Sequence, residues 1–185
     1  GYLGGSTDRI VRSSTDFIWG FPLILVAVLL VGGLGEGLFP VILAVGIVNV
    51  AAITRVVRGE VVGLKEKEFV EAARAAGVSS YRIMWRHLLP NVLAPALIMA
   101  SYLIAVAVIA EAALSFIGLG AQPPLPSLGK MIADGRGFLR INHWEATIPG
   151  IGIVVLVLSV SMIGDGLRDH FDPRLRHERG RKKNK

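Results

Sequence analysis

Side chains that could bind a metal ion or act as nucleophiles are few in this chain of 185 residues. The four histidines are scattered and form no set with metal-ligand spacing: His87, His143, His170 and His177. The sequence contains no cysteine, which excludes disulfides and thiolate chemistry, and no G-x-x-x-x-G-K-[ST] sequence that could hold a nucleotide phosphate. We therefore predict that the chain is not an enzyme and has no metal or cofactor of its own.

Two polar side chains lie within long apolar stretches, namely Asn49 and Glu111. A polar or ionisable group inside a membrane-spanning segment is a candidate for a functional role, so either residue could face a pathway or a gate. The alternative is structural. Glu111 would reach the interface or bond a neighbouring helix, and Asn49 would form a hydrogen bond between helices. We favour the structural role for both.

A polar insert separates two of the apolar stretches and carries Glu71-Ala72-Ala73, then Gly77, then Leu89-Pro90. Strong helix formers from Lys65 to Ala76 predict a helix, and Gly77 stands where a left-handed residue would end it. On this helix Phe69, Ala72, Ala73 and Ala76 share one face. Small residues on such a face would let another backbone approach closely.

A second short helix is predicted after Gly77. Ser79 or Ser80 can cap it, and Pro90 should prevent it from continuing unchanged. Its apolar residues follow helical spacing and form one stripe: Tyr81, Met84, Trp85 and Leu88. This stripe either packs on the chain's own helices or docks on a partner, and both can hold on different edges.

The elements that must position these residues are membrane helices. Hydrophobic residues make up 52% of the chain, and four stretches approach the ~20 residues needed to cross a bilayer. Lipid offers the backbone no hydrogen-bond partner, so these stretches should be helices. We predict an all-α membrane protein of about four transmembrane helices with a two-helix insert. The expected spans are Phe17–Leu34, Leu38–Thr54, Val92–Ile117 and Ala146–Gly164.

The longest loop, residues 118–145, contains Pro123, Pro124 and Pro126, which exclude a continuous helix there. A short helix capped by Ser127 and stopped near Gly135 or Gly137 is expected within it.

Basic residues predict the orientation. They are concentrated before the first span, in the insert and after the fourth span, and only Lys130, Arg136 and Arg140 lie in the long loop. The positive-inside rule therefore places both ends of the chain and the insert in the cytoplasm. The basic tail, residues 177–185, is better explained by attraction to anionic lipids than by nucleic-acid binding.

The insert resembles the cytoplasmic loop of inner-membrane permease subunits of bacterial ATP-binding-cassette (ABC) importers. Four further segments are similar to the C-type permease of the dipeptide/oligopeptide/nickel branch. The five segments occur in order over residues 1–176: Phe69-Val70-Glu71-Ala72-Ala73-Arg74, Arg86-His87-Leu88-Leu89-Pro90-Asn91, residues 110–120, Gln122-Pro123-Pro124, and Gly164-Asp165-Gly166-Leu167-Arg168-Asp169. The broad family has an aliphatic residue where this chain has His87, which the peptide branch commonly shows.

The resemblance implies a type I importer permease fold that lacks two N-terminal spans. It implies a bacterial or archaeal inner-membrane location and four partners: a homologous second permease, two cytoplasmic ATPase subunits that hold ATP and Mg, and an extracytoplasmic substrate-binding protein. The ATPase-coupling loop would consist of Glu71, Ala72, Ala73, Gly77, Tyr81, Trp85, Leu89 and Pro90. Glu71 would contact a basic residue of an ATPase subunit or brace the loop. The alternative is that Glu71 is an ordinary solvated residue that pairs with Lys67 and Arg74.

A second class of function is a self-contained secondary transporter or channel subunit, which would need intramembrane charges in a relay or paired broken helices. The sequence does not identify the cargo: dipeptides, longer peptides, nickel chelates and sugars all fit the resemblance.

Overall fold

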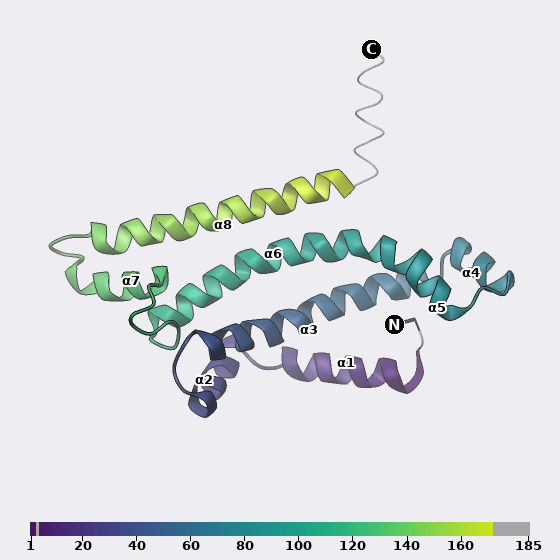
Figure 1. Ribbon diagram of the computed structural model, residues 1–185, viewed down its shortest axis with the longest axis horizontal. Coiled ribbons are helices and arrows are strands. Elements are labelled where there is room, and N and C mark those ends of the chain that lie inside the picture. Colours follow the sequence, from purple (N-terminus) through teal and green to yellow (C-terminus); the bar gives the residue numbers. More distant parts are fainter. Residues whose placement is uncertain (3, 172–185) are drawn as a thin grey trace, which may run out of the picture.

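Three long antiparallel helices dominate the computed structural model, which describes residues 1–2 and 4–171 (Figure 1). They are α3 (Leu38–Leu64), α6 (Leu89–Phe116) and α8 (Trp144–Phe171), with α6 between the other two. By length and composition these are the three described helices that could cross a membrane. The described residues contain no strand, which confirms the all-α prediction. The predicted basic tail, residues 177–185, lies outside the described residues.

The prediction of one helix over residues 17–34 is wrong. Helices α1 (Gly5–Trp19) and α2 (Leu23–Leu34) meet at an angle of 89°. Pro22 explains the break, because the residue before a proline is forced out of the helical region. With 12 residues, α2 is ~18 Å long, well short of the ~30 Å hydrocarbon core. A fourth crossing exists only if α1 and α2 cross together.

Helix α3 extends ten residues beyond the predicted span, from Thr54 to Leu64. Its length of 27 residues corresponds to ~40 Å, so its charged end projects past the apolar part. There α1 lies alongside α3 (Figure 1). Arg55 Nη2 donates to Asp16 Oδ1 at 2.9 Å, and Arg58 binds both carboxylate oxygens of Asp8 at 2.9 and 2.6 Å. These ion pairs fix α1 against α3.

Small residues allow the helices to pack closely. A Cβ added at Gly164 of α8 would lie 2.8 Å from the Ser101 Cβ of α6. A Cβ at Gly129, in the short helix α7 (Leu128–Gly135), would lie 2.0 Å from the Ala112 carbonyl oxygen. Lipid chains are as apolar as leucine, so close backbone approach is a main source of attraction between membrane helices.

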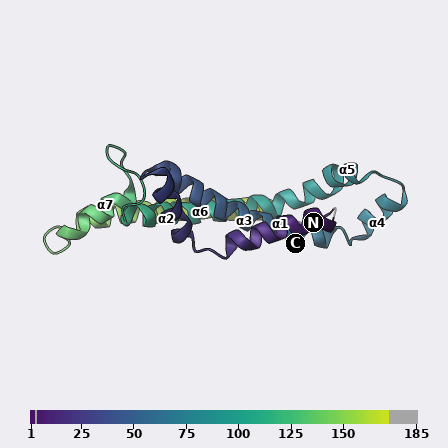
Figure 2. The ribbon, with the colours of Figure 1, turned by 90° about the horizontal axis from the view of Figure 1, so that it is seen from below.

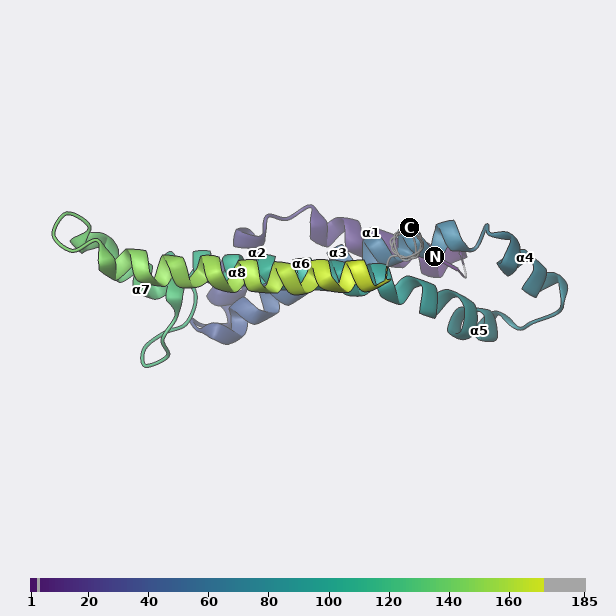
Figure 3. The same cartoon turned by 90° about the horizontal axis from the view of Figure 1, so that it is seen from above.

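The short helices lie at opposite ends of the elongated molecule (Figure 2). At one end are α4 (Glu68–Ala75) and α5 (Ser80–Ile83); at the other is α7, followed by a single 3₁₀ turn (Arg136–Phe138). As predicted, Ser127 is at the N-cap position of α7 and the helix stops at Gly135. Viewed from above, α8 lies along α6 and its last turn points to the α5 end (Figure 3).

We predict that Gly164→Val destabilises the protein by roughly 1–3 kcal/mol, because the larger side chain separates α8 from α6. Gly150→Val is the matched control on the same helix, since a Cβ there meets no atom within 4 Å. Thermal unfolding in detergent micelles measures both. Equal stability of the two variants would contradict the packing described here.

Candidate functional site

Helix α4 of the insert ends at a left-handed glycine, as predicted. Gly77 has φ of 74°. Its N–H donates to the Arg74 carbonyl at 2.9 Å, and the Val78 N–H donates to the Ala73 carbonyl at 3.0 Å. Together these form a Schellman motif, which satisfies two carbonyl groups at the helix end. The helix begins at Glu68, three residues later than predicted, because residues 65–67 form a turn.

A small apolar core holds the two halves of the insert together. Val70 of α4 and Ile83 of α5 are fully buried, and Leu88 is nearly so. Val61 and Leu64 at the end of α3 pack against this group. The insert is therefore anchored to the charged end of α3. The sequence analysis did not single out Val70 and Ile83, which lie next to Phe69 and Met84 of the predicted helix faces.

The predicted small-residue face of α4 stays largely exposed. Phe69, Ala72 and Ala76 are exposed, and of the four residues on that face only Ala73 is partly covered. Glu71 is exposed too, and no ion pair with Lys67 or Arg74 forms among the described residues.

As predicted, the second helix does not continue unchanged to Pro90, but the change is a π-helical turn and not an end of the helix. Helix α5 continues through a π-helical turn (Met84–Leu88) into α6, so that one helix extends from Ser80 to Phe116. The π turn changes the backbone hydrogen bonding just before the proline, which has no N–H. The Asn91 side-chain amide donates to the His87 carbonyl at 2.6 Å in the same place. Ser79 occupies the N-cap position, but its side chain makes no capping hydrogen bond.

The aromatic stripe divides between the two predicted roles. Leu88 and Met84 pack in or against the insert core. Tyr81 and Trp85 are 68% and 58% exposed, with ring centroids 6.0 Å apart. Two large aromatic side chains thus lie on the outside of the insert, where a partner could cover them. Leu89 and Pro90 are also exposed.

At the opposite end, Glu111 braces the loop that follows α6. Its Oε1 atom accepts hydrogen bonds from Ser115 Oγ at 2.6 Å and from Ser127 Oγ at 3.0 Å. Ser127 therefore bonds Glu111 instead of capping α7 with its side chain. The carboxylate links α6 to the start of α7, which agrees with the structural role favoured above. Glu111 also lines an otherwise apolar groove of about 520 Å³ between α3, α6 and α8.

Asn49 is half-buried on α3, and its side chain has no hydrogen bond to another described residue. The predicted bond between helices is therefore not found. Asn49 is not among the residues that line the groove next to Glu111, so the structure does not bring the two polar residues together. No group of three His, Asp or Glu side chains in the described part of the chain could hold a metal ion.

The family model described as "Binding-protein-dependent transport system inner membrane component" matches residues 1–177. The chain belongs to this family. It is 43% identical over 176 residues to the dipeptide transport system permease protein DppC of Alkalihalophilus pseudofirmus, covering 95% of this chain and 58% of that protein. It is 39% identical to the glutathione transport system permease protein GsiD of Pectobacterium atrosepticum, with the same coverage of both chains. The chain thus spans less than two thirds of the length of these relatives.

We predict that Gly77→Ala weakens the end of α4 by roughly 1–2 kcal/mol, because an L-residue resists the left-handed conformation. Gly59→Ala in α3 is the control, since both positions have open space for a Cβ and only Gly77 has positive φ. The control should be neutral or stabilising. Amide hydrogen exchange should become about tenfold faster around Val78 in Gly77→Ala only. Unchanged exchange there would exclude a contribution of the Schellman motif to the stability of the insert.

We predict that Glu111→Leu loosens the loop that follows α6. The hydroxyls of Ser115 and Ser127 lose their acceptor, at a cost of about 1–3 kcal/mol in stability. Amide exchange of residues 118–130 should accelerate accordingly. Glu145→Leu is the control: Glu145 is exposed and accepts one hydrogen bond from Asn142 at 3.2 Å. If the two variants exchange alike, Glu111 does not brace the loop.

Proposed function

We propose that this chain is part of a permease subunit of an ABC importer that moves peptides or similar small solutes across the cell membrane. The match to the family of inner-membrane transport components over residues 1–177 carries this proposal. The names of the two relatives, a dipeptide and a glutathione permease, favour peptides as the class of cargo. The membrane is the inner membrane of a bacterium or archaeon.

The insert couples the permease to the ATPase subunits in this proposal. Tyr81 and Trp85 are large, exposed and adjacent, and they sit on a helix whose opposite side is fixed by the insert core. A short helix that presents aromatic side chains in this way suits a groove on another protein. Glu71, Ala72 and Gly77 lie on the neighbouring helix and turn, where small side chains let a partner backbone come near.

The continuous helix from Ser80 to Phe116 gives the coupling a physical route. When two ATPase subunits close around ATP and Mg, the partner pushes on α5. Because the helix continues from α5 into α6, the push on α5 tilts α6. Glu111 sits near the far end of this helix and holds the outer loop, so movement of the helix reaches the outer face.

The remaining partners follow from the same function. A homologous second permease would complete the pathway, and a binding protein would deliver cargo to the outer loop. Many large apolar side chains on α2, α6 and α8 are exposed, including Leu29, Ile104 and Leu158. Lipid and the second permease would cover them. Both ends of this chain and the insert would face the cytoplasm, since Arg55, Arg168 and the insert lie at one end of the helices.

Site-directed cross-linking tests this proposal, and the 185 residues of this chain contain no cysteine that would react beside the introduced one. We expect Tyr81→Cys, placed in the full-length permease, to cross-link to an ATPase subunit in membrane vesicles. Ile141→Cys is the control, because it is 88% exposed and lies beyond α7 at the opposite end. It should react with an impermeant thiol reagent added from outside. The proposal fails if Ile141→Cys captures the ATPase, or if Tyr81→Cys is labelled from outside and never cross-links.

A further inference from the structure

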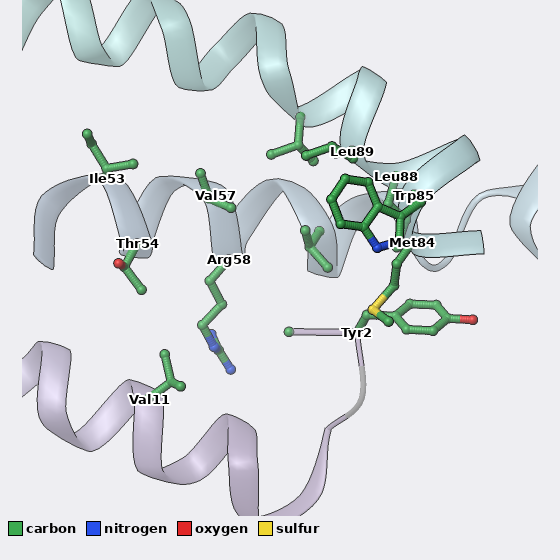
Figure 4. A pocket seen from close by; sticks show the side chains of 13 residues that line it. Tyr2, Val11, Ile53, Thr54, Val57, Arg58, Met84, Trp85, Leu88 and Leu89 are labelled. Carbon is green, nitrogen blue, oxygen red and sulfur yellow. The ribbon is translucent and has the colours of Figure 1, made fainter. Parts of the chain in front are cut away.

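An apolar groove runs between α1, α3 and the start of α6 at the insert end of the molecule (Figure 4). Its volume of about 520 Å³ is within the range of ligand sites, roughly 300–1,000 Å³. Aliphatic side chains form most of its wall, among them Val11, Ile53, Val57, Val61 and Val92. Trp85 forms part of its edge beside Leu88 and Leu89 (Figure 4).

A polar cavity of about 390 Å³ adjoins this groove and shares Thr54 and Arg58 with it. Two more guanidinium groups line the polar cavity, those of Arg12 and Arg55. A site with an apolar channel and a cluster of arginines at its mouth is amphipathic. It lies where the apolar part of α3 ends and its charged part begins, which is the depth of a lipid headgroup.

The arginines are only partly neutralised. Arg58 is paired with Asp8 through two hydrogen bonds. Asp16 alone serves the other two: it lies 2.9 Å from Arg55 Nη2 and 3.6 Å from Arg12 Nε. Among the side chains, three guanidinium groups therefore face two carboxylates, which leaves one positive charge in excess.

Free donors remain on the two arginines that share Asp16. Each guanidinium has five N–H groups, and Arg12 and Arg55 are 68% and 47% exposed. The Arg55 guanidinium lies over the Trp19 ring, with 4.7 Å between its Cζ atom and the ring centroid. This contact holds the guanidinium in place. This arrangement can accept a phosphate from the membrane side without breaking the pairs that fix α1 to α3.

We propose that this amphipathic site binds an anionic phospholipid, with the phosphate at Arg12 and Arg55 and one acyl chain in the groove. Basic pockets between membrane helices are suited to such headgroups. A soluble anion would leave the apolar groove exposed, and an uncharged lipid would leave the excess charge unused. The proposal is independent of the importer function proposed above.

Quenching of tryptophan by brominated lipid tests the site, because Trp85 forms its edge. The probe is the chain with Trp144→Phe and with Trp19→Phe, which keeps an aromatic ring against Arg55. It is reconstituted in bilayers of brominated phosphatidylglycerol or brominated phosphatidylcholine. We expect phosphatidylglycerol to bind next to Trp85 about fivefold more tightly, as expected for one excess charge near the membrane surface. The preference should weaken as salt concentration rises.

Arg12→Gln is the decisive variant. It removes the excess charge but leaves the Arg55–Asp16 and Arg58–Asp8 pairs intact, so the fold should be retained and the lipid preference should disappear. Arg82→Gln is the control, since Arg82 is exposed on the insert and does not line either cavity. Equal quenching by the two lipids in the parent would overturn the proposal. Failure of both lipids to quench Trp85 would also overturn it, because protein would then cover the groove.

Discussion

Close backbone contact between helices determines how this molecule is held together. In lipid, leucine side chains gain little by leaving the solvent, so helices associate where small residues let them touch. Gly164 meets Ser101 between α8 and α6, and Gly129 meets the Ala112 carbonyl between α7 and α6. Helix α6 is thus fixed to α8 and to α7, and the loop that follows α6 is fixed to its end. The proposed tilting of α6 depends on these contacts.

The continuity of α5 with α6 depends on a local change in the helix. A proline near the start of a membrane helix would ordinarily allow a joint, yet here the π turn at Met84–Leu88 keeps the helix unbroken. A joint at Pro90 would let the insert swing without moving the span. A continuous helix instead joins the insert, with its core of Val70 and Ile83, directly to the span. Toward the other end of this helix lies Glu111, bonded to Ser127.

The sequence predicts those features whose cause is local. Hydrophobic length gives the long helices, Gly77 gives the end of α4, and Ser127 gives the start of α7. Two prolines in helical patterns have different outcomes. Pro22 lies in a stretch of suitable hydrophobic length and breaks it, whereas Pro90 is accommodated by a π-helical turn. The outcome depends on whether the surrounding residues offer an alternative hydrogen-bond pattern, which spacing alone does not reveal.

The candidate site was harder to predict, because burial there depends on packing between segments. Tyr81, Met84, Trp85 and Leu88 are equivalent by helical spacing, yet two pack inward and two remain exposed. The difference comes from the end of α3, which covers only one edge of the second helix. The same geometry places Trp85 beside the groove under α1, so a single exposed face adjoins both the partner surface and the membrane surface.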